Sequence, residues 1–303
     1  MAVTVVNYNT FEHLRKCLYS VEPEAPQEVY VVDNASTDGS LEMVKAEFPG
    51  THVIANQGNP GYGTAANQAI FQTGAKYVLL LNSDTCIQPG TLSNLSGYME
   101  RHPHAAVVGP RLVNPDGSLQ PSCYSFPTPS HVFLEESSLW RLIGLVPVLD
   151  DHYLRTWSHS YSRPVPWVLG AALVIRRDAF LDLGGFDTSF FMGHEEVDFC
   201  YRLLAAGWQT HFTPCATIVH FGGASTQQQR SEMLVQFYLS LIQFYKKHYS
   251  TRRLWQVNLM MKGIVVLRFL RDSAFLKFET EKSRRAWIVE GLKAWQRIFL
   301  YQT

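Results

Sequence analysis

Carboxylate and amide side chains recur where four short apolar runs of the sequence end. The polar stretches are Asn7–Asn9, Asp33–Asp38, Asn56–Asn59 and Asn82–Thr85. In open α/β sheets, ligands bind outside the carboxyl ends of the strands. Because four successive strand ends would deliver such groups to one edge of a sheet, the sequence predicts a nucleotide or sugar site there.

Asp84 is the candidate metal-binding carboxylate of this edge. It follows the apolar run Leu79–Leu81, which is typical of a buried strand. A single carboxylate can hold a hard divalent cation when water and diphosphate complete the oxygen shell. His220 ends the apolar pair Ile218–Val219 and is a candidate second ligand. Each residue also has a structural interpretation, Asp84 as a loop cap and His220 as a core histidine.

Three carboxylates, Glu195, Glu196 and Asp198, stand at the start of a predicted helix. Their favourable interaction with the helix dipole is the structural interpretation. The functional interpretation is a general base, because adjacent carboxylates repel each other and the pKa of one is raised. The helical step places Glu195 and Asp198 on one face and Glu196 on another. One carboxylate can therefore face a site while the others hold structure.

A glycine-containing loop, Asn59–Asn67, precedes an alanine-rich predicted helix. Glycines at such a place let backbone N–H groups approach an anion at the helix N-terminus. The loop lacks both the GxGxxG and the P-loop lysine spacing. A phosphate cradle and an ordinary loop-to-helix turn are therefore both open.

The elements that must position these residues alternate between strands and helices. Strands are expected at Ala2–Val6, Glu28–Val32, Thr51–Ala55, Tyr77–Leu81, Trp167–Ile175, Gln209–Phe212 and Ala216–His220. Helices are expected at Thr10–Val21 with Thr10 as cap, Ser40–Phe48, Thr64–Thr73, Asp178–Leu183, Glu195–Ala206, and from about Ser231 onward. This alternation predicts a parallel sheet with helices on both faces. The proline-rich stretch Gln120–Pro166 has little periodicity and is expected to be a lid or binding loop.

Composition excludes several classes of protein. The 303 residues are 46% hydrophobic and 17% charged, which excludes a disordered or collagenous chain. Lys plus Arg and Asp plus Glu both number 26, which argues against a uniformly basic nucleic-acid binder. Five scattered cysteines without a CxxC pair predict free thiols in a reducing compartment. Met1 leads directly into a strand-like run, and no apolar stretch approaches about 18 residues, so neither a signal peptide nor a membrane span is expected.

The charge is unevenly distributed. From Tyr245 onward there are 13 basic and 4 acidic residues, a net charge of +9, which leaves −9 for the remainder. Such a basic tail suits an anionic partner, either a membrane surface or a phosphate-bearing acceptor, but it also suits a solvated helical tail. The basic residues spread over more than one helical face. Packing on the catalytic domain, packing on a second copy as a homodimer, and peripheral membrane contact therefore all stay open.

Taken in order, these motifs resemble those of family-two glycosyltransferases with a GT-A fold, and most closely the rhamnosyltransferase-like branch of bacterial cell-surface polysaccharide synthesis. The matching segments are Val3–Asn9, Val31–Gly39, Asn59–Asn67, Leu80–Thr85, Gly184–Asp187, Glu195–Asp198 and His220. The resemblance covers Ala2–Ser225 and extends weakly to His248. It implies an α/β fold with a mixed, mainly parallel sheet flanked by helices and a C-terminal helical extension. Residues 1–228 would form the catalytic domain, with a nucleotide-binding half (1–118) and an acceptor or catalytic half (119–228), and residues 229–303 the helical region.

The resemblance implies a role for each residue that matches a family motif. The residues that would surround the donor nucleotide are polar or glycine, and they are Asn7, Tyr8, Asn9, Asp33, Asn59, Gly61, Asn67, Asn82, Ser83 and Asp84. Gly170, Ala171 and Asp198 would lie near the donor sugar and the acceptor.

The resemblance also implies a metal and a base. Asp84 would be the metal-bound carboxylate of a DxD-type motif, and His220 a further ligand of Mg²⁺ or Mn²⁺. One of Glu195 and Glu196 would deprotonate the acceptor hydroxyl, and the second position is the usual base. Two departures stand out: the metal motif is Asn82-Ser83-Asp84, with one carboxylate, and Glu-Glu replaces the usual Glu-Asp. The second departure lengthens the base by a methylene group.

The function that this family implies is an inverting, metal-dependent hexosyl transfer from dTDP-rhamnose or a UDP-sugar to a hydroxyl of a glycan or lipid-linked acceptor. Its expected place is the cytoplasm or the inner face of the cytoplasmic membrane. A nucleotide-sugar-binding protein without activity would have a broken carboxylate set, whereas Asp84, Glu195 and Glu196 are present. A sugar nucleotidyltransferase would need a glycine-rich loop with a basic residue where this chain has Asn7–Asn9.

Overall fold

The computed structural model describes residues 1–137, 154, 157–223 and 226–301. These residues divide into two units. The first contains Met1–Phe126, Val148–Phe191 and Glu195–Ser225, and the second contains Pro127–Pro147, Met192–His194 and Thr226–Thr303. The boundary between residues 228 and 229 that the sequence suggests stays a prediction.

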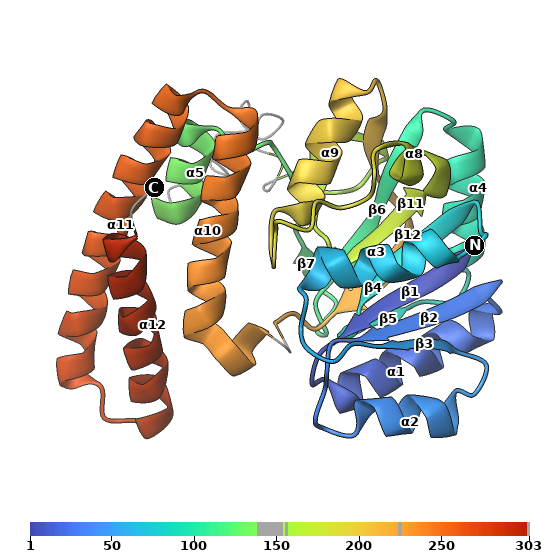
Figure 1. The fold of residues 1–303 in the computed structure, drawn as a ribbon, viewed down its shortest axis with the longest axis horizontal. Helices are drawn as coiled ribbons and strands as arrows, with labels where there is room; N and C mark the ends of the chain where they lie inside the picture. Colours follow the sequence, from blue (N-terminus) through green and yellow to red (C-terminus); the bar gives the residue numbers. More distant parts are fainter. Residues whose placement is uncertain (138–153, 155–156, 224–225, 302–303) are drawn as a thin grey trace. The chain divides into compact units, whose positions relative to one another are not determined.

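Four parallel strands form the first half of the sheet, in the order β3-β2-β1-β4. They are β1 (Ala2–Asn7), β2 (Glu28–Asp33), β3 (His52–Ala55) and β4 (Tyr77–Asn82). The helices between them are α1 (Phe11–Val21), α2 (Ser40–Glu47) and α3 (Tyr62–Gln72), with a 3₁₀ turn at Glu22–Glu24. Figure 1 shows α1 and α2 on one face of these strands and α3 on the other. This βαβ arrangement and its residue ranges confirm the sequence prediction.

The second half of the sheet mixes strand directions. β11 (Ala172–Arg176) runs antiparallel between β4 and β6 (Ala105–Val113), and β12 (Gln209–His220) runs parallel to β6. Short strands complete this half: β5 (Thr85–Ile87), β7 (Leu119–Gln120) and β9 (Arg163–Val165), with β8 (Cys123–Tyr124) and β10 (Trp167–Val168) as a separate pair. Helices α4 (Thr91–Arg101), α8 (Arg177–Asp182) and α9 (Glu195–Ala205) belong to the same unit. The sheet is therefore mixed and flanked by helices, as predicted.

Two strand predictions are wrong. The expected strand Trp167–Ile175 is interrupted, because Leu169 donates its N–H to the carbonyl of Ser122, just before β8, and Gly170 donates its own to Glu196 of α9. The two expected strands between Gln209 and His220 are one strand, whose register shifts between Thr213 and Thr217. Pro214 lies in this shift and has no N–H to donate to a ladder.

Other differences involve a cap and a loop. Thr10 stands at the cap position of α1, but its hydroxyl bonds elsewhere, and Asp38 accepts the N–H of Phe11 at 2.8 Å instead. The stretch Gln120–Pro166 contains a helix, α5 (Pro129–Ser137), which its weak periodicity did not predict. Residues 138–153 and 155–156 of that stretch lie outside the described residues.

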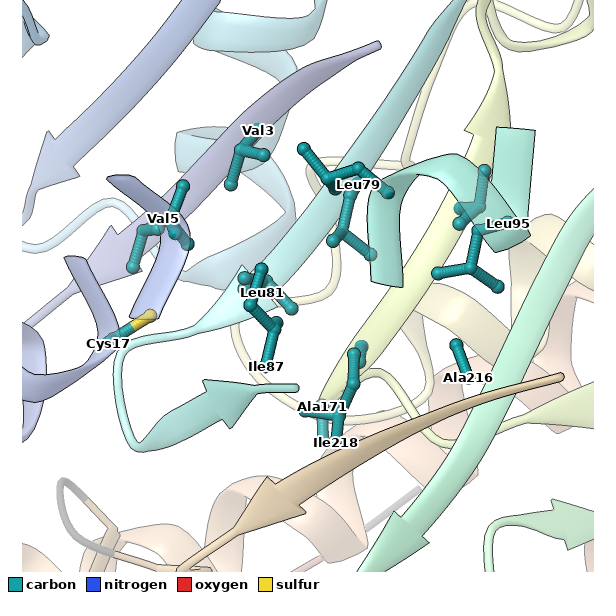
Figure 2. Close-up of a cluster of buried hydrophobic side chains, with 14 of the residues drawn as sticks. Val3, Val5, Cys17, Leu79, Leu81, Ile87, Leu95, Ala171, Ala216 and Ile218 are labelled. Carbon is teal, nitrogen blue, oxygen red and sulfur yellow. The ribbon is translucent and has the colours of Figure 1, made fainter. Parts of the chain in front are cut away.

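The main core lies between the sheet and the helices α1, α2 and α4. Figure 2 shows side chains from β1, β4 and β12 meeting those from helices, among them Val5, Leu79, Leu81, Leu95 and Ile218. Successive inward residues of one strand are two positions apart because strand side chains alternate between faces. Because one set of alternate side chains must be buried, the register of each strand is fixed, and so is the position of the polar residues that follow it.

The second unit is helical. It contains α10 (Arg230–His248), α11 (Thr251–Phe278) and α12 (Lys282–Leu300), as the pattern after Ser231 predicts, and also α5, which was not predicted. Buried polar contacts join its helices: Trp295 Nε1 donates to Asp272 Oδ2 at 2.9 Å, and Tyr238 donates to Asn258 Oδ1 at 2.6 Å. Within the described ranges, no helix combines the length and apolarity needed to cross a bilayer.

Truncation of a core side chain should destabilise the first unit. Leu79 is fully buried in β4, so we expect Leu79→Ala to lower the free energy of unfolding by about 2–5 kcal/mol, through lost burial and a cavity. Leu204 of α9 lies in the same unit and is 59% exposed. Leu204→Ala is the matched control, with an expected change within about 0.5 kcal/mol. Urea denaturation followed by circular dichroism measures both, and equal midpoints for the two variants would contradict the assignment of the core.

Candidate active site

The loops after β1 and β2 are hydrogen-bonded to each other. Asn7 donates to Asp33 Oδ1 at 2.8 Å, and both side chains are buried. Ser36 donates its N–H to Asp33 Oδ2 at 2.9 Å. Asn9, with a φ of 51°, accepts the N–H of Thr37 at 2.8 Å. The carboxyl ends of the first two strands therefore form one fixed polar surface, as expected from the sequence.

The network continues to β3 and to the loop before α3. Asn34 donates to Asn59 Oδ1 at 3.2 Å and accepts from Asn56 Nδ2 at 2.9 Å. Asn34 lies inside the second polar stretch but was not among the predicted site residues. Tyr8 is half-buried in the loop after β1. The residues expected around a nucleotide at β1, β2 and β3 are thus brought together.

Toward β4, a hydroxyl connects the strand ends. The Oγ atoms of Thr10 and Ser83 lie 2.6 Å apart, and Thr10 donates to Asn7 Oδ1 at 2.6 Å. Asn82 donates its N–H to Ala171 O at 2.9 Å, which joins the metal motif to the start of β11. The hydroxyl of Thr10 therefore serves the strand ends, which explains why it does not cap α1.

Asp84 and His220, which are 136 positions apart, meet through the pairing of β5 with β12. His220 lies opposite Thr85 in this antiparallel pair, and Phe221 donates its N–H to Asp84 O at 2.9 Å. His220 Nε2 consequently lies 3.3 Å from Asp84 Oδ1, and both residues are buried. The structure thus brings together the two residues for which a metal role is expected.

Gln120 of β7, which the sequence analysis did not identify, orients this histidine. Gln120 Oε1 lies 2.7 Å from His220 Nδ1, while its amide nitrogen donates to Asn114 Oδ1 at 3.0 Å. Because the carbonyl oxygen can only accept, the proton is assigned to Nδ1, and the lone pair of the neutral ring is at Nε2.

A divalent cation fits this pair of side chains. His220 Nε2 is buried without a hydrogen bond, and it faces a carboxylate oxygen. An imidazole nitrogen oriented by a hydrogen bond at its other nitrogen is a common arrangement for a metal ligand. Within the part of the chain that the structure describes, no cluster of three or more His, Cys, Asp or Glu residues forms a complete site.

Glu196 lies beside the interruption between β10 and β11. Gly170 donates its N–H to Glu196 Oε1 at 3.2 Å, and the Tyr62 hydroxyl donates to Gly170 O at 3.0 Å. Burial first, and then the negative charges of Glu195, Glu196 and Asp84, raise the pKa of Tyr62 well above its ordinary value. Tyr62 therefore stays a protonated donor that holds Gly170 in place. Its function was not apparent from the sequence because the partner is 108 positions away.

The other two carboxylates of α9 face different neighbours. Glu195 is buried against α3, where a Cβ added at Gly63 would lie 3.4 Å from Glu195 Cβ. Asp198 is fully buried and accepts from Arg202 Nε at 2.7 Å. The same guanidinium donates to the carbonyls of Leu183 and Gly185, so Asp198 stabilises the turn after α8. Its expected role near the sugar or the acceptor stays a prediction.

The loop before α3 is held by backbone contacts. At Gly61 φ is 92°, and a Cβ there would lie 2.3 Å from Phe191 O, which accepts the N–H of Tyr62 at 3.0 Å. Both amide atoms of Asn67 are bonded to the backbone of Phe186, at 2.8 and 2.9 Å. These groups are used within the chain, and the donor contacts expected of Gly61 and Asn67 stay predictions.

Two protein-family models match the chain. The model described as glycosyl transferase family 2 matches residues 2–143, and glycosyl transferase family group 2 matches residues 77–289. The N-acetylglucosaminyl-diphospho-decaprenol L-rhamnosyltransferase of Mycobacterium tuberculosis is 30% identical, over 96% of this chain and 98% of that protein. Rhamnosyltransferase WbbL of Escherichia coli (strain K12) is 22% identical, over 72% of this chain and 82% of that protein.

The fold also matches a solved structure. The mannosyltransferase PcManGT from Pyrobaculum calidifontis, in complex with GDP-Man and Mn²⁺, superposes with a TM-score of 0.57 at 17% sequence identity. The match covers 99% of this chain and 86% of that one. It confirms the GT-A fold that the motifs predict.

The Gly61 contact gives a prediction with a control in the same loop. Gly61→Ala would place a methyl group against a backbone carbonyl and force a positive φ, so we expect it to cost about 1–3 kcal/mol or more of stability. Gly58 has no atom within 4 Å of an added Cβ, so Gly58→Ala should stay within about 0.5 kcal/mol. Urea unfolding measures both, and a neutral Gly61→Ala would show that the loop does not need its close approach to Phe191.

Proposed function

The chain belongs to glycosyl transferase family 2, and we propose that it transfers L-rhamnose from dTDP-rhamnose, or a related sugar from a UDP donor, to a hydroxyl of a lipid-linked glycan, with inversion at the anomeric carbon. The observation that carries the proposal is one hydrogen-bonded series: Asn82 is bonded to Ala171, and the adjacent Gly170 is bonded to Glu196. It links the strand that ends in the metal motif to a buried carboxylate.

The acceptor assignment is supported by the relative from M. tuberculosis, whose name specifies N-acetylglucosaminyl-diphospho-decaprenol as the molecule that receives rhamnose. We propose the same class of acceptor here, an N-acetylglucosaminyl-diphosphopolyprenol. The cytoplasm, or the inner face of the cytoplasmic membrane, stays the predicted place of the reaction.

The donor nucleotide is proposed to bind over the ends of β1 to β4. We propose that Asn7 and Asp33 contact the base and ribose, and their mutual hydrogen bond fixes the carboxylate before a ligand arrives. Such preorganisation reduces the ordering that binding requires. No described side chain is assigned to distinguish thymine from uracil, so both dTDP-rhamnose and a UDP-sugar should be tested as donors.

Asp84 and His220 are proposed to hold Mg²⁺ or Mn²⁺ together with the donor diphosphate. The buried Nε2 of His220 and the facing carboxylate support this assignment, and the superposed mannosyltransferase was solved with Mn²⁺. When bound, such a cation neutralises charge that develops on the leaving nucleoside diphosphate. Because two described side chains alone make an incomplete oxygen and nitrogen shell, we expect the cation to bind chiefly in the presence of nucleotide.

Glu196 is proposed as the general base. Its carboxylate takes the proton of the acceptor hydroxyl as that oxygen forms a bond to the anomeric carbon. The bond from this carbon to the diphosphate oxygen breaks, and its electron pair leaves with the nucleoside diphosphate. Attack from the face opposite the leaving group inverts the anomeric centre. The Gly170 N–H and the Tyr62 hydroxyl orient the base, and Glu195 is the alternative.

The decisive experiment compares the wild-type chain with Glu196→Gln. We expect the wild-type chain to transfer rhamnose to a short-chain N-acetylglucosaminyl-diphosphoprenol, with NMR showing an inverted anomeric configuration. Glu196→Gln should lower the rate at least about 100-fold because general base catalysis is lost. Binding of dTDP or UDP, measured by calorimetry, should change less than threefold.

The matched control is Glu195→Gln, which changes the neighbouring carboxylate in the same way. Loss of transfer in Glu195→Gln alone would reassign the base to Glu195. Retention of configuration in the product would overturn the inverting mechanism, and absence of transfer from every donor tested would overturn the donor and acceptor assignment.

The metal proposal predicts a binding result that does not depend on turnover. Calorimetric titration of dTDP should show tighter binding with Mn²⁺ than without it. In His220→Ala, the ratio of the dTDP affinities with and without Mn²⁺ should be at least about tenfold smaller, as expected for loss of one ligand. His104 is an exposed histidine of the same unit, and His104→Ala should leave the enhancement unchanged. Equal binding with and without Mn²⁺ in the wild-type chain would remove the metal role of Asp84 and His220.

A further inference from the structure

One side of α11 exposes large apolar side chains along most of its length. Six of the eight exposed large apolar residues of α11 share this side: Trp255, Leu259, Val266, Leu267, Leu270 and Phe278, with exposed fractions from 40% to 83%. Of the other two, Phe269 (39%) lies next to this side and Phe275 (60%) lies on the opposite one. At 3.6 residues per turn, these six positions fall within an arc of about 140°. We call them the α11 stripe. Six exposed large apolar residues on one helix face differ from the scattered apolar residues of an ordinary protein surface.

The stripe is not the side through which α11 packs in its own unit. Val257, Met261, Ile264 and Val265 are buried, and they lie on the opposite side of the helix. The helix therefore has two apolar sides, of which one is used by the second unit and the other is exposed. An exposed apolar surface of this kind is typical of an interaction site.

The charged residues of α11 that border the stripe are positive. Arg252 lies near its first end, Lys277 near its last, and Lys262 borders its middle. The one acidic residue of α11, Asp272, is buried and accepts hydrogen bonds from Arg271 and Trp295. Long basic side chains can lay their stems along an apolar surface while their charged groups reach polar surroundings.

We propose that the α11 stripe lies in the interfacial layer of an anionic lipid membrane, with the basic side chains at the level of the headgroups. The stripe combines apolar and aromatic residues with positive charge, which is the combination that such helices use. A second copy of the chain is a poorer partner, because a symmetric contact would bring the basic residues of both stripes together with no acidic residue to neutralise them. The inference rests on the proposed function in one respect: a polyprenol-linked acceptor is presented at a membrane surface.

The test is co-sedimentation of the full chain with vesicles. We expect strong binding to vesicles of phosphatidylglycerol and phosphatidylcholine in equal parts, and at least tenfold weaker binding to pure phosphatidylcholine. The double variant Leu267→Glu/Leu270→Glu should lower binding to the anionic vesicles at least tenfold. Both positions are exposed, so the fold should survive, and an unchanged far-ultraviolet circular dichroism spectrum and thermal unfolding curve would verify that.

A matched control lies on another helix of the same unit. Leu300 of α12 is 66% exposed, and Leu300→Glu should keep wild-type binding to vesicles. Lipids with brominated acyl chains should quench part of the tryptophan fluorescence of the wild-type chain. In Trp255→Phe this lipid-dependent quenching should fall by at least half.

Several outcomes would overturn the proposal. These are no binding of the wild-type chain to anionic vesicles, equal binding to pure phosphatidylcholine, or unchanged binding of the double variant. A wild-type dimer in sedimentation velocity that the double variant makes monomeric, without vesicle binding, would assign the stripe to a contact between copies. Vesicle binding without sugar transfer to the short-chain acceptor would overturn the proposed function. It would still support the proposal that the α11 stripe binds membranes.

Discussion

Among the described residues of the first unit, five carboxylates are buried, and the burial of charge is unfavourable unless opposite charges or hydrogen bonds compensate for it. They are Asp33, Asp84, Glu195, Glu196 and Asp198. Arg202 compensates Asp198 directly, and His220 faces Asp84. Asp33 is compensated by the Asn7 amide and the Ser36 N–H, and Glu196 accepts the N–H of Gly170. Much of the local structure follows from this requirement, because each loop that supplies a donor must keep one conformation.

The local sequence pattern predicted the parallel half of the sheet well, because each of its strands is a short apolar run followed by polar residues. It could not predict that β5, with three residues, pairs with β12, since this contact is decided by packing across the whole sheet. That pairing is what brings His220 to Asp84. The functions of Gln120 and Tyr62 were missed for the same reason: each acts on a residue about 100 positions away, and neither side chain type suggests chemistry on its own.

The C-terminal helices show a different limit of sequence patterns. A single apolar stripe gives a helix a clear amphipathic period, but α11 has two apolar sides, and their contributions to the period oppose each other. The basic residues consequently look scattered in the sequence, although the structure places Arg252, Lys262 and Lys277 along one exposed face. Only the burial of Val257 and Ile264 identifies which side packs internally. The charge excess of the tail was visible from composition, whereas the surface that it borders was not.

The substitution of Glu for Asp at the second position of the base motif is best understood together with Gly170. A glutamate extends further than an aspartate, and in a tight site the extra methylene would need space. Gly170 provides it, since a Cβ at this position would lie 3.2 Å from Glu196 Oε1 and 3.4 Å from its Cδ. The absence of a side chain also exposes the N–H of Gly170 to the carboxylate. The interruption between β10 and β11 is therefore part of the arrangement around the proposed base, because a continuous strand would direct this N–H into the ladder of the sheet. If Glu196 is the base, its longer side chain and the broken strand form one arrangement, and each accounts for the other.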